Sequence, residues 1–263
     1  MIFLKPLALL SIFLGIAFSN TPEVENAMDI NLNGMDFISS LENVLWMERV
    51  NSKSDDLAQM YTKDAYKVLD DGSYLNGNEV ITAYYKKSNL DITSIDTDTL
   101  MVANSRRGLE YEIGSFYDSN DQHYKQILVW ETGESDRKRV LEIIEKVSRG
   151  SSHTAAINDA RARWMGYCNA HDVSGLANNI YSENTLYYNH KPLVIGRDQL
   201  IKEYQYMTRP SYSLKLTPIV SEAINETTVF EIGQCAEGYN GKYIIVWKKA
   251  ENGNWEVFLD SNI

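Results

Sequence analysis

The stretch "LEYEIGSFY" (Leu109–Tyr117) recurs later in the chain as "TVFEIGQCA" (Thr228–Ala236). Four further segments recur in the same order, and the offset between the members of each match stays near 118–120 residues. Five matches in one order indicate an internal repeat. The other four matches join Tyr124–Trp130 to Tyr243–Trp247, Trp46 to Trp164, Asp55–Ala65 to Ser174–Thr185, and Leu75–Tyr85 to Val194–Tyr206.

A repeat of this length indicates a duplicated domain, because solenoid repeats are only about 20–50 residues long. The 263 residues are enough for two domains of ordinary size. We expect a first domain over residues 36–147 and a second over residues 153–263. Between them, residues 148–152 ("SRGSS") have the small polar composition of a linker.

The N-terminal segment "MIFLKPLALLSIFLGIAFSN" has the pattern of a secretory signal peptide over residues 1–19. Its apolar run is about a dozen residues long, which is short of the ~20 residues that span a bilayer. We therefore expect a periplasmic or secreted protein without a stable membrane span. The formal net charge is −11 and no long run of Lys and Arg occurs, so we expect no nucleic-acid partner.

The second copy shows the expected elements most clearly. Apolar residues at helical spacing predict a first helix around Trp164, and Asp172 or Ser174 can cap a short second helix. The strand "TLYYNH" and the helix "RDQLIKEYQYM" follow, and four more strands complete the copy, with Asn252–Gly253 as a hairpin turn. Helices on one side of an antiparallel sheet predict an α+β fold.

Two segments of the second copy, "NAHDVSGLANNIYSENTLYYNHKPLVIGRDQLIKEY" and "WEVFLDSNI", resemble the SnoaL-like branch of the nuclear transport factor 2-like (ketosteroid isomerase-like) superfamily. The first copy matches more loosely, because its last strand "KRVLEIIEKV" lacks the Trp and Asp. The resemblance implies two tandem cone-shaped domains. Each is a curved antiparallel sheet around about three helices, and a pocket opens between the sheet and the helices of the domain. It implies no single function, since the superfamily includes isomerases, dehydratases, cyclases, ligand binders and dimerisation modules.

Enzymes with this fold work mostly by proton abstraction, which needs a His or carboxylate base and hydrogen-bond donors. His190 ends the opening strand of the second copy, and it is either a catalytic base or donor or a rim histidine bound to a loop. Tyr187 and Tyr188 precede it and point to opposite faces of the strand, so one of them is a candidate donor.

Three more side chains complete the candidate catalytic set. Glu231 lies inside an apolar strand, as does its counterpart Glu112, and it faces either solvent, the default for an alternating strand, or the pocket. Asp260 on the last strand is either a pocket acid or a capping group. Tyr167 on the first helix projects either into the pocket or into the core.

Arg197, Arg209 and Trp164 are the candidate substrate-binding residues. Arginine binds carboxylate or sulfate groups, and an indole ring offers a stacking face. Arg106 and Arg107 are further candidates for holding an anionic group.

The two cysteines, Cys168 and Cys235, are either a disulfide, which an oxidising compartment permits, or two buried core residues. No histidine stands at metal-ligand spacing from either, so we expect no metal site. The chain has no Gly-rich phosphate loop and no other cofactor motif, so we expect no cofactor.

These features favour a secreted lyase, most specifically a dehydratase that abstracts a proton from a uronic-acid-containing oligosaccharide. The alternatives are a non-catalytic small-ligand-binding or dimerisation module and a ketosteroid-isomerase-like isomerase. Superfamily domains commonly pair through their sheets, so we also expect the two copies to form an intramolecular pseudo-dimer.

Overall fold

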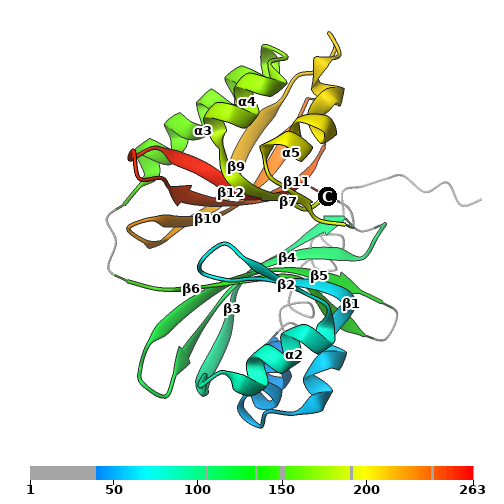
Figure 1. The fold of residues 1–263 in the computed structure, drawn as a ribbon, viewed down its shortest axis with the longest axis vertical. Helices are drawn as coiled ribbons and strands as arrows, with labels where there is room; N and C mark the ends of the chain where they lie inside the picture. The colour runs from blue at the N-terminus through cyan, green and yellow to red at the C-terminus, as the bar shows by residue number, and fades with distance from the viewer. Residues whose placement is uncertain are drawn as a thin grey trace, which may run out of the picture.

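The computed structural model describes residues 40–104, 106–133, 136–148, 152–189, 192–237 and 240–262. These residues form two six-stranded sheets, and each sheet has helices on one face (Figure 1). The expected signal peptide over residues 1–19 lies outside the described residues. No helix within the described ranges has the length and apolar content needed to cross a membrane.

The first domain begins with a helix over residues 40–51 and continues through two further helical segments and six strands. In chain order these are the 3-10 helix η1 (Asp55–Met60), β1 (Tyr61–Val68), β2 (Tyr74–Asn76), α2 (Asn78–Lys87), β3 (Ile92–Asn104), β4 (Leu109–Asp118), β5 (His123–Thr132) and β6 (Arg137–Lys146).

The second domain repeats this order. It contains α3 (Thr154–Asn169), α4 (Val173–Ile180), β7 (Tyr181–Tyr187), β8 (Val194–Ile195), α5 (Arg197–Glu203), the 3-10 helix η2 (Tyr204–Thr208), β9 (Lys215–Asn225), β10 (Thr228–Ala236), β11 (Gly241–Lys249) and β12 (Trp255–Asn262). The strand orders β2-β1-β6-β5-β4-β3 and β8-β7-β12-β11-β10-β9 are the same. The two tandem cone-shaped α+β domains predicted from the sequence are therefore confirmed.

The local signals behave as their chemistry requires. Asp172 caps α4, because its Oδ1 atom accepts a hydrogen bond of 2.7 Å from the backbone N–H of Gly175. The expected third helix divides at Tyr204, where the chain tightens into η2. Because 3-10 spacing places residues three apart on one side, Tyr204 and Met207 are both buried.

The sheets are mixed, which corrects the expectation of purely antiparallel strands. β1 pairs in parallel with β6, and β7 pairs in parallel with β12. The helix after β2 carries the chain to the far edge of the sheet. Antiparallel pairing of β3 with β4, β4 with β5 and β5 with β6 then returns the last strand beside the first, in the same direction.

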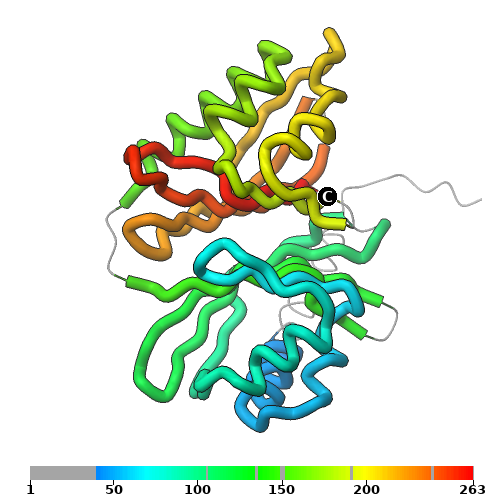
Figure 2. Tube along the Cα trace, viewed as in Figure 1, coloured from blue at the N-terminus to red at the C-terminus, as the bar shows by residue number. Residues whose placement is uncertain are grey.

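The two sheets face each other and the helices lie on the outer sides of the molecule (Figures 1 and 2). One apolar core joins the facing surfaces, and it includes Tyr111, Ile127 and Val129 of the first domain and Phe230, Ile232 and Ile244 of the second. Polar contacts also cross the interface, among them an ion pair of 2.6 Å between Lys125 and Glu222. This arrangement fits the expected intramolecular pseudo-dimer.

A matched pair of substitutions tests this shared core. Ile232 is fully buried between the sheets, whereas Ile219 on the neighbouring strand is 48% exposed. We expect Ile232→Ala to lower the free energy of unfolding by about 2–5 kcal/mol, and Ile219→Ala to change it by less than about 0.5 kcal/mol. Urea denaturation measures both, and equal effects would contradict the packing.

Candidate functional site

A cavity of about 540 Å³ opens between the sheet and the helices of the second domain. Aromatic and apolar side chains form most of its wall, and a few polar groups converge on it, as is typical of ligand sites. Its floor is buried, and its mouth carries exposed polar residues. The lining residues include Trp164, Cys168, Tyr204, Tyr206, Arg209 and Asp260.

A carboxyl group bound by two tyrosines lies in this wall. Asp260 is fully buried, and its Oδ2 atom accepts a hydrogen bond of 2.8 Å from the hydroxyl of Tyr181. Tyr204 donates to the same oxygen, and the two tyrosine hydroxyls lie 2.8 Å apart. The other oxygen, Oδ1, is buried and has no hydrogen-bond partner among the described residues.

Burial shifts the pKa values of the groups in this cluster. It raises the pKa of Asp260 to about 6, and the hydrogen bonds from Tyr204 and Tyr181 only partly oppose that effect. Burial also raises the pKa of both tyrosines well above its usual value, so they remain protonated donors at neutral pH. A carboxyl with a pKa near working pH beside neutral donors can act as a general acid or base.

Neighbouring residues hold the cluster in place. Tyr187 pairs with Asp260 across the parallel strands, and its ring contacts that of Tyr204 with the centroids 5.1 Å apart. The Tyr187 hydroxyl donates to Asn262 Oδ1 at 2.9 Å and accepts from Asn189 Nδ2 at 2.8 Å. Tyr187 thus positions Tyr204 from behind, and both asparagines line the cavity.

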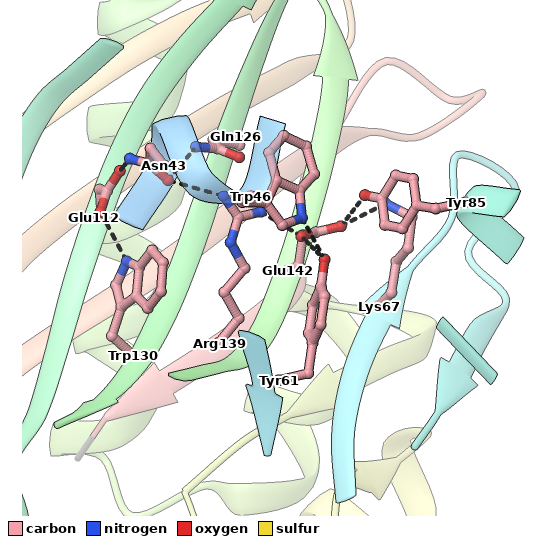
Figure 3. A network of polar contacts seen from close by, with 10 residues as sticks. All are labelled: Asn43, Trp46, Tyr61, Lys67, Tyr85, Glu112, Gln126, Trp130, Arg139 and Glu142. Carbon is pink, nitrogen blue, oxygen red and sulfur yellow. Dashed lines mark hydrogen bonds and ion pairs between the residues drawn. The ribbon is translucent and has the colours of Figure 1, made fainter. Parts of the chain in front are cut away.

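The first domain contains an equivalent cluster around Glu142, in which the carboxylate has different partners (Figure 3). Glu142 on β6 is fully buried and accepts hydrogen bonds from Tyr61, at 2.7 Å, and from Tyr85. Lys67 Nζ also contacts Glu142 Oε1 at 2.7 Å, and Arg139 Nη1 contacts Oε2 at 2.5 Å. Glu142 therefore has two cationic partners as well as two tyrosines.

Strand register establishes the equivalence. Asp260 pairs with Tyr187 and Ile245, and Glu142 pairs with Lys67 and Leu128 at the same places of the first sheet. The first copy therefore carries a glutamate at the position of Asp260, although its last strand lacks the Asp of the second copy. The corresponding tyrosines are Tyr61 with Tyr181 and Tyr85 with Tyr204, and both pairs fall within the repeat matches.

The two cations of the first domain have no charged equivalents in the second. Tyr187 stands in place of Lys67, and Val257, which pairs with Tyr181, stands in place of Arg139, which pairs with Tyr61. Although burial alone raises the pKa of Glu142, Lys67 and Arg139 bring it down to about 2. A hollow of about 410 Å³ in the first domain reaches Lys67 but not Glu142. That carboxylate is fixed in its charged form.

Glu231 is fully buried and is not among the described residues that line the cavity. Its carboxylate binds Arg161 of α3 through two N–H groups, and the Tyr243 hydroxyl donates to Oε1 at 2.9 Å. The solvent-facing orientation expected by default is wrong, because the facing sheets and helices cover both sides of the strand. In the first domain, Asn43 donates to Glu112 at 2.5 Å in the same way.

Two other candidates lie away from the cavity. Arg197 donates from Nε and Nη2 to the backbone carbonyl of Tyr181, at 2.9 and 2.6 Å, and so braces the start of β7. Tyr188 points away from Tyr187, as predicted from strand alternation, and lies in the core between the two sheets. Its ring lies 6.4 Å from that of Tyr66.

The remaining candidates are placed as follows. Trp164 and Arg209 line the cavity, whereas Tyr167 packs beside Gly175 on α4. His190 lies outside the described residues. The cysteines, Cys168 and Cys235, are free thiols, and both line the cavity.

Burial raises the pKa of both thiols, that of Cys235 to about 12, so they are neutral wall groups. Among the described residues, no group of three or more His, Cys, Asp or Glu side chains could hold a metal ion.

The chain is similar to several solved structures, each over about the length of one copy. One is an NTF-2 like protein of unknown function from Shewanella oneidensis, with 15% identity, a TM-score of 0.37, and coverage of 42% of this chain and 98% of the other. A second is a ketosteroid isomerase-like protein from Erwinia carotovora, with 14% identity, a TM-score of 0.34, and coverage of 42% of this chain and 95% of the other. A third is an NTF2-like protein with a cystatin-like fold from Novosphingobium aromaticivorans, with 14% identity, a TM-score of 0.35, and coverage of 41% of this chain and 79% of the other.

No family model matches the chain, and no curated protein matches its sequence. The fold assignment itself rests on the strand order and helix placement of the two domains.

The raised pKa of Asp260 predicts a pH-dependent stability difference. A carboxyl that binds its proton more tightly when folded stabilises the protein at low pH, and this contribution is lost as the pH rises through about 6. From pH 4 to 7, wild type should therefore lose roughly 2–3 kcal/mol of unfolding free energy relative to Asp260→Asn. Urea titrations of both proteins measure this, with the exposed Asp159→Asn as control. A difference that stays constant with pH would contradict the burial of an ionisable group.

Proposed function

We propose that the second domain is a proton-transfer enzyme in which Asp260 is the catalytic base. The observation that carries the proposal is that Asp260 lines the cavity and that its buried Oδ1 atom has no hydrogen-bond partner among the described residues. Tyr181 and Tyr204 occupy the other oxygen, so the basic site of the carboxylate is directed away from them. The first domain supports the fold and does not catalyse, because its equivalent carboxylate is locked by two cations.

The reaction that fits is elimination of water next to a carboxyl or carbonyl group. Asp260 takes the proton from the carbon beside that group, and the electron pair forms a carbon–carbon double bond as the C–O bond to the β-hydroxyl breaks. The same proton then passes to the leaving oxygen, so that water is the only other product. Protonated tyrosine hydroxyls stabilise the negative charge that develops on the way.

The proposed substrate is a uronic-acid-containing oligosaccharide. The aromatic side chains of Trp164, Tyr206 and Tyr212 line the cavity and offer faces on which sugar rings stack. The carboxylate of a uronic acid acidifies the neighbouring C–H, which suits a base whose pKa is near 6. An exported protein, as the N-terminal segment predicts, would meet such sugars outside the cell.

Ultraviolet absorbance of a conjugated carboxylate provides the assay. The purified chain is incubated with a panel of uronic-acid oligosaccharides, and the absorbance and product masses are followed. We expect Asp260→Asn to reduce the rate by about 10²–10⁴-fold, the range for loss of a general base. The rate of the wild type should rise with pH and level off above about 6, where Asp260 is ionised.

Asp159→Asn, an exposed Asp on α3, is the matched control and should retain full activity. Tyr204→Phe should lower the rate less than Asp260→Asn, because Tyr181 still donates to the carboxyl group. The proposal fails if no sugar in the panel loses water, or if the Asp260→Asn protein turns over as fast as wild type.

A further inference from the structure

The first domain contributes residues to the cavity of the second. Asn104, the last residue of β3, and Arg107, in the turn between β3 and β4, line this cavity together with Asp260 and Arg209 of the second domain. The site that contains the proposed base is therefore completed only when both domains are in place.

The β3–β4 turn has a braced backbone. Asn104 Oδ1 accepts hydrogen bonds from the backbone N–H groups of Arg106 and Arg107, at 3.1 and 3.3 Å. Gly108 has a φ of +62°, and a Cβ atom there would lie 2.3 Å from the carbonyl oxygen of Thr132. The Gly108 carbonyl also accepts from the Thr132 N–H at 2.6 Å. These bonds hold the backbone of Arg107 at the cavity mouth.

The equivalent turn of the second domain is shorter and has no basic residue. Strand pairing closes at Asn104 and Leu109 in the first domain and at Asn225 and Thr228 in the second. Four residues separate the first pair and two separate the second, so the first turn is two residues longer. Asn225 caps its own turn in the same way, by accepting from the backbone N–H of Thr227 at 3.0 Å. The first domain therefore has the same Asn-capped turn as the second domain, with two additional residues and two arginines.

Two cations and two acids line the cavity among the described residues. Among the described lining residues the cations are Arg107 and Arg209, and the acids are Glu237 and the buried Asp260. The formal net charge of −11 repels anions at long range, so only local cations can hold one. Arginine binds a carboxylate through parallel N–H donors, which gives strength and orientation.

We propose that Arg107 and Arg209, one from each domain, form a split subsite that binds the carboxylate of the ligand at the mouth of the Asp260 cavity. The proposal rests on the function proposed above and restricts its substrates to sugars that carry a carboxylate. It makes Arg107 a specificity-determining residue that acts across the domain interface.

Binding is measured separately from turnover, in full chains that carry Asp260→Asn. Tryptophan fluorescence reports occupancy, because Trp164 lines the cavity. The probes are trimers of galacturonic and glucuronic acids and the neutral trimers made by reducing their carboxyl groups. We expect an acid trimer to bind about tenfold more tightly than its neutral counterpart, and Arg107→Ala to remove that preference.

Arg106→Ala is the matched control, because Arg106 is an exposed arginine of the same turn that does not line the cavity. It should leave the preference unchanged. If Arg107→Ala retains the preference, or if no acid trimer binds more tightly than its neutral counterpart, the split subsite is wrong. If the preference depends on Arg107 but the wild type converts none of the trimers, the subsite stands and the proposed reaction falls.

Discussion

A buried carboxyl group at the same position of each sheet is the constraint on which the rest of the structure depends. Glu142 and Asp260 are both fully buried, and an ionised carboxylate without partners in such a place costs several kcal/mol. The first domain meets this cost with Lys67 and Arg139, which keep the carboxylate charged and fill the space around it. The second domain meets it by letting Asp260 take up a proton near pH 6. Only the second solution leaves one carboxyl oxygen without a hydrogen-bond partner among the described residues.

The face-to-face packing of the sheets decides where chemistry can occur. Each sheet has one face against the other sheet and one face against its own helices. The interior between sheet and helices is therefore the place in each domain where a ligand can reach a side chain from the sheet. Because the sheets overlap, a turn at the edge of the first domain meets the mouth of the second, as the turn with Arg107 does. A duplicated chain can thus build a site from both copies.

More of the fold than of the candidate site could be predicted from the sequence. The five ordered matches predicted two copies of one domain, and the family resemblance implied their cone shape. The parallel pairing of β1 with β6 joins segments far apart and has no local signal. Glu142 was missed because an Asp-to-Glu exchange hides it within an otherwise dissimilar strand. Alternation separates Tyr187 from Tyr188 yet does not say which of them faces the cavity. The tyrosines of both clusters were detectable, since they recur in both copies.

The duplication also explains how a destabilising buried carboxyl group, that of Asp260, can persist. At neutral pH a buried Asp260 with a raised pKa destabilises the second domain, and its cavity removes packing contacts as well. The carboxylate of the first domain carries no such cost, because Lys67 and Arg139 lower the pKa of Glu142 to about 2. The apolar core shared by the two sheets couples the unfolding of the two domains, so the stability of the first domain supports the second. Two linked copies can therefore keep a buried carboxyl with a raised pKa in one half while the other half maintains the fold.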